Sequence, residues 1–292
     1  ALADRVYTSR LIGAEPDLVL HGGGNTSVKA SARDLFGRDV RVLYVKGSGS
    51  DLARIEPAGL PALLLQPLLE LRALDALSDE DMVAQARRAL LDPAAPTPSV
   101  ETLLHAFLPA PFVDHSHADA ILALTNQPDG EARVRALFGA RVGWVPWAMP
   151  GFALAKLAAE VYEQNADVEG LLLLKHGLFT FGATARQSYE RHIAIVDAAE
   201  TFAKKRRYWS TRSSLPPVHG DGDQLHQVVV NLIVNAQHAL LGRSAPRRLT
   251  VRGWADGAEV VLEVADNGPG MRAEVAKRAF EPFFTTKPQG VG

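Results

Sequence analysis

The sequence predicts an α/β fold, because short apolar runs alternate along the chain with longer stretches of helical periodicity. Three of the apolar runs, residues 40–45, 112–115 and 171–174, have the length of buried strands. Glycine and proline cluster at the places where such elements must turn, at residues 21–24, 46–49, 93–98 and 146–151. We therefore expect a sheet flanked by helices, with the polar residues of interest gathered in its loops.

Two helices are expected in the first part of the chain, over residues 61–77 and 184–204, where apolar side chains recur at helical spacing. The polar stretch 208–217 follows and ends in a Pro-Pro pair, which stops a helix. We place a domain boundary there. The predicted organisation is a first domain of residues 1–207, a linker of residues 208–217 and a second domain of residues 218–292.

The second domain is expected to begin with a helix over residues 221–240. Two runs of alternating apolar residues follow within residues 249–264, and Asp256-Gly257 between them is a turn signal. This pattern predicts a β-hairpin, after which the chain reads Asp266-Asn-Gly-Pro-Gly.

Composition narrows the classes of function. A chain of 292 residues with 47% hydrophobic content can bury at least one sizeable core. The formal charge of -2 comes from well-mixed charges, so nothing predicts a nucleic-acid partner or an anionic membrane surface. No apolar run approaches the roughly 20 residues that span a bilayer. Without cysteine there are no disulfides and no thiolate metal ligands, which suits the cytoplasm.

A His-x-His pair is the first candidate for chemistry. On an extended backbone His115 and His117 point to one face, while Asp114 and Ser116 point to the other. The predicted third ligand is His176, which follows a buried-strand run and precedes a glycine. Three neutral imidazoles with an open fourth position make a catalytic zinc site. For the His-x-His pair alone, two surface or core histidines without a metal remain an open alternative.

One glutamate and two glycine-rich loops are further candidates. Glu101 follows Pro98 and Ser99, and by itself it reads as a first-turn glutamate favoured by the helix dipole. The loops at residues 21–27 and 46–50 allow backbone N–H groups to approach an anion closely. Neither loop matches a Walker or dinucleotide fingerprint, so a tight turn is the simpler interpretation of each.

Taken in order, these motifs resemble the class II aldolase/adducin family along nearly the whole first domain. The motifs are Gly24-Asn-Thr-Ser, Lys46-Gly-Ser-Gly, Pro98-Ser-x-Glu, His115-x-His and Lys175-His-Gly. The chain is most similar to rhamnulose-1-phosphate aldolase-like members, which are often joined to a short-chain dehydrogenase domain. The resemblance implies a three-layer α/β/α domain with a mostly antiparallel sheet. It assigns zinc to His115, His117 and His176, acid/base catalysis to Glu101, and phosphate binding to Asn25, Gly47, Ser48 and Ser99.

The activity implied is that of a carbon–carbon lyase. Zinc would bind the hydroxyl and carbonyl oxygens of a ketose 1-phosphate of the rhamnulose or fuculose type and stabilise the enediolate, and Glu101 would move the proton. The products would be dihydroxyacetone phosphate and an aldehyde. Val100 stands where many members have a second serine, so one phosphate contact is expected to be missing. Members are commonly tetramers, which implies a homo-oligomer with a small-molecule sugar phosphate as its partner. An adducin-like binding module without catalysis is the alternative within the family.

Three later motifs are similar to the first boxes of the histidine-kinase ATPase domain, an α/β sandwich. They are Asn231-Leu-Ile-Val-Asn-Ala, Asp266-Asn-Gly-Pro-Gly-Met and Phe280-Glu-Pro-Phe-Phe-Thr-Thr-Lys. The resemblance implies Mg²⁺-ATP as a cofactor, and it assigns nucleotide contacts to Asn231, Asn235, Asp266, Gly268, Gly270 and Lys287. The last glycine box only begins at Gly290, and no phosphoacceptor motif of the His-Glu-Leu-Arg-x-Pro-Leu kind occurs. We therefore expect an incomplete, inactive ATP-binding fragment. The alternative is a signalling protein whose ATPase segment is functional and whose aldolase-like domain is a non-catalytic sensor or scaffold.

Overall fold

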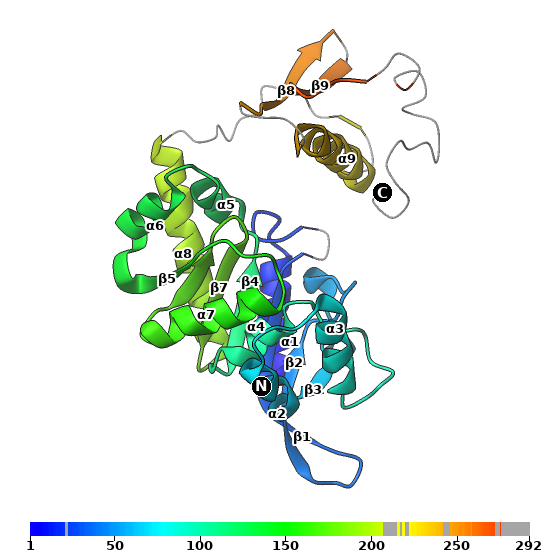
Figure 1. Ribbon diagram of the computed structural model, residues 1–292, viewed down its shortest axis with the longest axis vertical. Helices are drawn as coiled ribbons and strands as arrows, with labels where there is room; N and C mark the ends of the chain where they lie inside the picture. Colours follow the sequence, from blue (N-terminus) through cyan, green and yellow to red (C-terminus); the bar gives the residue numbers. More distant parts are fainter. Residues whose placement is uncertain are drawn as a thin grey trace. The chain divides into compact units, whose positions relative to one another are not determined.

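The computed structural model describes residues 1–20, 23–206, 215, 216, 218, 219, 222–241, 246–257, 259–271 and 275. The chain divides into two compact units, Ala1–Ser210 and Thr211–Gly292 (Figure 1). Nearly all of the predicted linker, residues 208–217, lies outside the described residues, so its extent stays a prediction.

The first unit is built on a seven-stranded sheet with the strand order β3-β2-β1-β4-β7-β6-β5. The strands are β1 (Asn25–Arg33), β2 (Asp39–Val45), β3 (Ala62–Leu64), β4 (Phe112–Ser116), β5 (Val142–Val145), β6 (Gly170–Leu173) and β7 (Gly177–Gly182). All neighbouring strands are antiparallel except β5 and β6, which are parallel. The sheet is therefore mixed and mostly antiparallel, as the sequence predicts.

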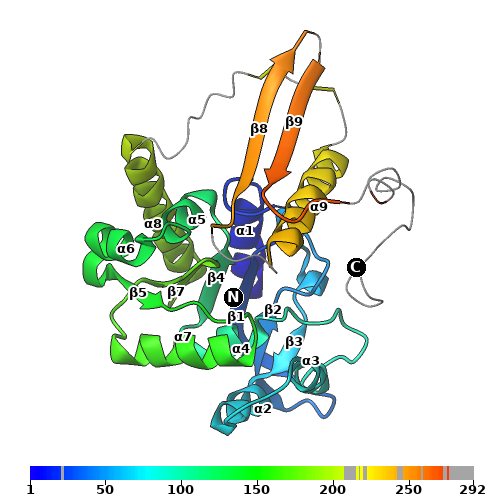
Figure 2. The same ribbon diagram turned by 45° about the horizontal axis from the view of Figure 1, so that its top comes forward.

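Helices cover both faces of this sheet (Figure 1 and Figure 2). One face carries α1 (Leu2–Gly13), α5 (Asp119–Thr125), α6 (Gly130–Phe138) and α8 (Ala185–Arg206), and the other carries α2 (Leu65–Glu70), α3 (Asp79–Arg88), α4 (Thr102–Phe107) and α7 (Phe152–Gln164). Alternation along β6 divides the core, because Leu171 and Leu173 pack beside α4 and α7 whereas Leu172 packs beside α5 and α8. Each such leucine contributes about 1.5–3 kcal/mol by burial. The three-layer α/β/α prediction is confirmed.

The single helix predicted over residues 61–77 is wrong. That segment forms β3, then α2, then a 3-10 turn at Leu71–Ala73. Leu63 pairs with Leu43 of β2, and the Leu64 N–H donates to the Ala89 carbonyl, so sheet pairing overrides the helical periodicity. Short apolar runs cannot be assigned to helix or strand from periodicity alone.

The second unit contains α9 (Gly222–Leu241) and a hairpin of β8 (Leu249–Asp256) and β9 (Glu259–Asp266). The hairpin reverses between Asp256 and Glu259, with Gly257 at φ 60°, so the predicted turn is correct to within one residue. The predicted helix 221–240 is confirmed as α9, whose residues Ala236 and Leu240 are buried. No helix in the described part of the chain has both the length and the apolarity needed to cross a membrane.

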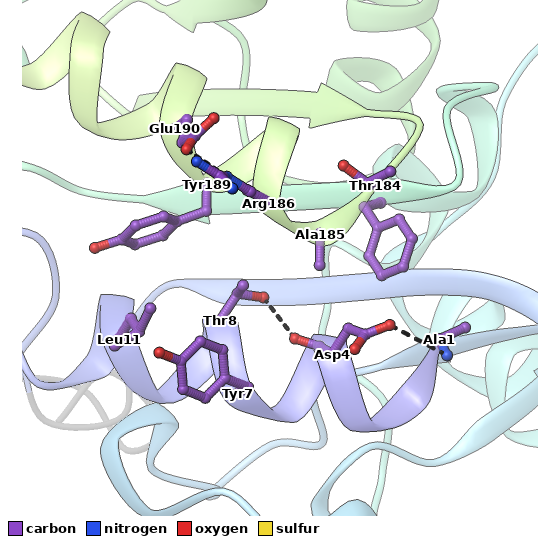
Figure 3. A pocket seen from close by; sticks show the side chains of 11 residues that line it. Ala1, Asp4, Tyr7, Thr8, Leu11, Thr184, Ala185, Arg186, Tyr189 and Glu190 are labelled. Carbon is purple, nitrogen blue, oxygen red and sulfur yellow. Dashed lines mark hydrogen bonds and ion pairs between the residues drawn. The ribbon is translucent and has the colours of Figure 1, made fainter.

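A hollow of about 640 Å³ opens between α1 and α8 (Figure 3). Its lining includes Tyr7 and Leu11 of α1, Tyr189 of α8 and Phe112 of β4. Phe112 and Val113 point to opposite faces of the sheet, so the hollow lies on the face away from α4 and α7. It is therefore separate from the cluster of histidines described next.

Candidate metal centre

Strand β4 carries His115 through the centre of the sheet, between β1 and β7, and all five residues of the strand are buried. The ring of His115 stacks on Phe179 of β7 at a centroid distance of 4.0 Å, and its Nδ1 lies 3.0 Å from the Leu178 carbonyl oxygen. His117 follows directly after the strand ends at Ser116. This backbone places both imidazoles together, as the alternation predicts.

The third histidine arrives on the turn between β6 and β7. Lys175 occupies the left-handed region at φ 57°, which reverses the chain just before His176. A Cβ at Gly177 would lie 2.3 Å from the carbonyl oxygen of Ser116, so only glycine allows this turn to pack against β4. His176 can therefore lie close to β4 only because the next residue, Gly177, has no side chain.

The three histidines form a cluster that fits a metal ion. One nitrogen from each of His115, His117 and His176 lies within 4.8 Å of the others, and the Nε2 atoms of His115 and His117 are 2.9 Å apart. Tetrahedral zinc with nitrogen bonds of 2.0–2.1 Å separates its ligands by about 3.4 Å. Small side-chain adjustments therefore bring these nitrogens to zinc geometry.

Glu101 faces this cluster from the N-terminal end of α4. Its Oε2 lies 3.4 Å from Nε2 of His115, and its Oε1 lies 2.9 Å from Nε2 of His176 without the alignment of a hydrogen bond. The side chain makes no capping bond to its own helix. The carboxylate therefore contacts the histidines and does not cap its own helix.

Burial and charge set the protonation states in the cluster. Burial lowers the pKa of His115 well below its ordinary value and also lowers the pKa of His117. For Glu101 burial raises the pKa, but His115, His176 and the Asn25 amide together outweigh it and hold the pKa far below the usual range. A metal cation binds neutral imidazoles, and the lowered pKa values of His115 and His117 favour that form. A cation here would also give the unpartnered Glu101 Oε1 a partner.

The residues assigned to phosphate lie beside Glu101. Asn25 Nδ2 donates to Ser99 Oγ at 3.1 Å, and Gly47 forms an isolated β-bridge with Pro98. These contacts bring the start of β1, the segment before α4 and the loop after β2 into one group. Ser99 and Asn25 are thus direct neighbours, although 74 positions separate them.

The backbone of the Gly47-Ser48 turn is already engaged within the protein. The Gly47 N–H donates to the Gly59 carbonyl at 2.9 Å, and the Ser48 N–H donates to the Thr97 carbonyl at 2.8 Å. These two N–H groups therefore already have hydrogen-bond partners within the protein and are not available to a phosphate. The Ser48 hydroxyl donates to the Pro98 carbonyl only at 3.4 Å, so it is the group in this turn best able to exchange partners.

Two residues near the site were not assigned from the sequence. Lys46 is only 5% exposed, and burial lowers its pKa against the opposing charges of Asp51 and Glu101. It begins the Lys-Gly-Ser-Gly motif, in which only Gly47 and Ser48 were expected to contact phosphate. His105 is fully buried and lies four residues after Glu101. This spacing of about one helical turn is the sequence feature that could have indicated its proximity to Glu101.

The far face of β4 is held by buried polar contacts that the sequence did not reveal. Arg5 of α1 forms a fully buried ion pair with Asp114 and also donates to the Val113 carbonyl. His192 of α8 lies 2.6 Å from Ser116 Oγ through its Nε2. The two residues that flank His115 are thus fixed from behind by α1 and α8.

Of the residues assigned to nucleotide, Lys287 lies outside the described residues. Asp266 ends β9, and its Oδ1 accepts the Gly268 N–H at 2.7 Å, which closes a local turn. Asn231 and Asn235 are exposed on α9, one helical turn apart. Gly268 lies against α9, since a Cβ there would approach Ala239 Cβ to 3.1 Å. The described part therefore brings the Asp266 turn beside α9, and Gly270 follows at φ 74°.

Comparison with known proteins identifies the family of the first unit. Residues 3–203, more than half of the chain, match the family model described as the class II aldolase and adducin N-terminal domain. The chain belongs to the class II aldolase and adducin family. The N-terminal class II aldolase domain of a conserved protein from Thermoplasma acidophilum is 47% identical, with a TM-score of 0.65 over 68% of this chain and 92% of that one.

A curated relative of this class II aldolase unit is an uncharacterized oxidoreductase, YuxG, of Bacillus subtilis, which is 41% identical over 201 residues. Residues 220–292 match the model of the histidine kinase-, DNA gyrase B- and HSP90-like ATPase, and the two-component sensor PprA of Pseudomonas aeruginosa is 44% identical over 84 residues. Both resemblances are thereby confirmed. The matches span 69% and 26% of this chain, but only 29% of YuxG and 9% of PprA.

Proposed function

We propose that the first unit is a zinc-dependent class II aldolase that cleaves a ketose 1-phosphate of the rhamnulose or fuculose type to dihydroxyacetone phosphate and an aldehyde. One observation carries this proposal: ring nitrogens of buried His115, exposed His117 and half-buried His176 converge within 4.8 Å, and the carboxylate of Glu101 lies against two of these histidines. An adducin-like binding module would have no need for this combination.

The reaction breaks the bond between C3 and C4 of the ketose. The C4 hydroxyl loses its proton and becomes the aldehyde, while the bonding electrons pass to the ketose carbonyl and leave an enediolate that is later protonated at C3. His115, His117 and His176 would hold the zinc ion, which when bound supplies Lewis-acid stabilisation of this negative charge. Glu101, ionised and within 3.5 Å of two ligand nitrogens, moves one of the two protons.

The phosphate group would bind at the meeting point of Asn25, Ser48 and Ser99. The hydroxyls of Ser48 and Ser99 would supply donors. Buried Lys46, whose backbone carbonyl accepts the Ser99 N–H, would supply positive charge. Charge-assisted hydrogen bonds to phosphate are roughly twice as strong as neutral ones. The other three members of this group are uncharged, so Lys46 is the residue that matches the charge of the substrate.

The test is elemental analysis of the purified full chain before and after chelation, together with cleavage assays on rhamnulose 1-phosphate and fuculose 1-phosphate. Stoichiometric zinc and cleavage that stops on chelation and returns with zinc are the expected results. A chain that holds no zinc and cleaves neither substrate after zinc is added would overturn the proposal.

The match of residues 220–292 to the ATPase model favours one second candidate, a signalling protein that binds nucleotide through its second unit. Equilibrium dialysis with Mg²⁺-ATP separates the two. Tight binding that Asp266→Asn abolishes would establish the signalling function. Absence of binding would leave the aldolase unit as the functional part, with the second unit an inactive fragment.

We also propose a cytoplasmic homo-oligomer. Leu35 and Phe36, at the tip of the β1–β2 hairpin, are 95% and 77% exposed, and an interface would cover this apolar surface. Sedimentation velocity on the full chain and on a Leu35→Ser/Phe36→Ser variant tests the assembly. The variant is expected to dissociate, and a monomeric parent chain would contradict the proposal.

A further inference from the structure

One face of β1 forms a polar seam with α4. Asn25, Ser27 and Lys29 alternate along the strand, so their side chains share a face, and none is more than 9% exposed. Asn25 donates to Glu101 Oε2 at 2.5 Å, Ser27 Oγ lies 2.7 Å from His105 Nδ1, and Lys29 Nζ donates to the His105 carbonyl at 2.7 Å. Three alternate positions of the strand therefore contact Glu101 or His105.

The partners of His105 determine its tautomer. Its Nε2 contacts Oδ1 of Asn25, and an amide oxygen only accepts hydrogen bonds, so Nε2 carries the proton. Burial lowers the pKa of His105 to about 3, so the ring is neutral and Nδ1 is an acceptor. The Ser27 hydroxyl therefore donates to Nδ1. Hydrogen bonds run in one direction, from Ser27 to His105 to Asn25.

This direction also fixes the amide of Asn25. With Oδ1 held by His105, the NH₂ group faces Glu101 Oε2 and Ser99 Oγ. The flipped amide would place its oxygen against the ionised carboxylate and its NH₂ against an N–H donor, and both contacts are repulsive. His105 and Glu101 thus together fix the amide, with its oxygen towards His105 and its NH₂ group towards the carboxylate.

We propose that His105 is a positioning residue which, as the Nε2-protonated tautomer and through Asn25, holds the Glu101 carboxylate towards the three histidines. Its role rests on the aldolase function proposed above. His105 does not contact the substrate, because its ring is fully buried between Ser27, Asn25 and Phe179. A single tautomer of His105 then keeps the Glu101 carboxylate in one orientation.

The matched pair His105→Gln and His105→Asn tests this step in the full chain. A glutamine amide reaches as far as Nε2 and can still donate to Asn25, whereas an asparagine amide reaches only as far as Nδ1 and contacts Ser27 alone. We expect His105→Asn to lower kcat on the order of 10- to 100-fold with KM and zinc content unchanged, as loss of outer partners at metal sites does. His105→Gln should recover most of kcat.

Two further readings make the test decisive. Asn25→Ala combined with His105→Asn should be no slower than Asn25→Ala alone, because both changes break the same chain of bonds. Equal losses in the Gln and Asn variants, or additive losses in the double variant, would overturn the proposal.

Nitrogen-15 spectra of the histidine-labelled chain without metal report the tautomer of His105, assigned by the signal lost in His105→Gln. A neutral ring protonated at Nε2 is expected, and protonation at Nδ1 would overturn the proposal. This spectrum does not depend on activity. If the unchanged chain cleaves no substrate, the aldolase function fails, while the tautomer still decides whether His105 directs Asn25.

Discussion

Arg5 and Asp114 form an ion pair that is completely buried between α1 and β4, although 109 positions separate them. Asp114 is the residue before His115, so the pair fixes the strand from the face opposite the histidines. Arg5 also donates to the carbonyls of Ser27 and Val113, which ties β1 to β4 directly below the site. The position of the histidines on one face of the sheet therefore depends on a buried ion pair on the opposite face.

Asp114→Asn is expected to destabilise the first unit strongly, because it leaves the Arg5 guanidinium buried without a counter-charge. Breaking one side of such a pair costs about 3–5 kcal/mol. Urea unfolding followed by circular dichroism measures this loss. The exposed helix pair Arg135 and Glu131 is the control, and Glu131→Gln should cost no more than about 0.5 kcal/mol. Similar losses in the two variants would show that the buried pair contributes little.

Gly177→Ala is expected to lower stability by about 1–3 kcal/mol and to weaken zinc binding, because the added methyl group collides with the Ser116 carbonyl. Thermal unfolding and zinc titration of the same preparation measure both effects. Gly37→Asn is a control at an open turn with φ 75°, a conformation that asparagine tolerates. Normal zinc affinity in Gly177→Ala would mean that the turn can shift without moving His176.

Stability of the metal-free chain should fall as the pH drops from about 6.5 to about 4. Burial lowers the pKa of His192 from 6.5 to about 4, so between these values the unfolded chain binds the proton and the folded chain does not. The contribution is complete above pH 6.5 and is lost on the acid side. Unfolding midpoints across this range, compared with His192→Gln, measure it. The variant should show a flatter dependence, and an equally steep one would assign the effect to other groups.

His117→Ala and His176→Ala should each remove zinc and cleavage together, because three ligands are the minimum for a catalytic site. Metal content and initial rates on the same samples provide the measurement. His219→Ala, at an exposed histidine in the second unit, is the control and should keep both. Cleavage that persists in a metal-free variant would rule out the zinc mechanism.

Local patterns explain what was predictable about the fold. Helix α8 and the β8–β9 hairpin follow from helical spacing and from alternation around a turn signal, both of which operate within a few residues. The helix prediction for residues 61–77 was wrong because β3 forms through its pairing with β2 and its hydrogen bond to Ala89. No signal within the segment carries that information.

The sequence by itself determined the chemistry available to this protein: three histidines and a glutamate in family order, with alternation that turns His115 away from Asp114. The tertiary structure decided how those groups are held, through Arg5 behind β4, His105 behind Asn25, and Gly177 against Ser116. The reason is physical. Side-chain alternation and turn propensity are local properties, whereas a buried hydrogen bond between distant residues exists only once packing has excluded water and brought its two partners together.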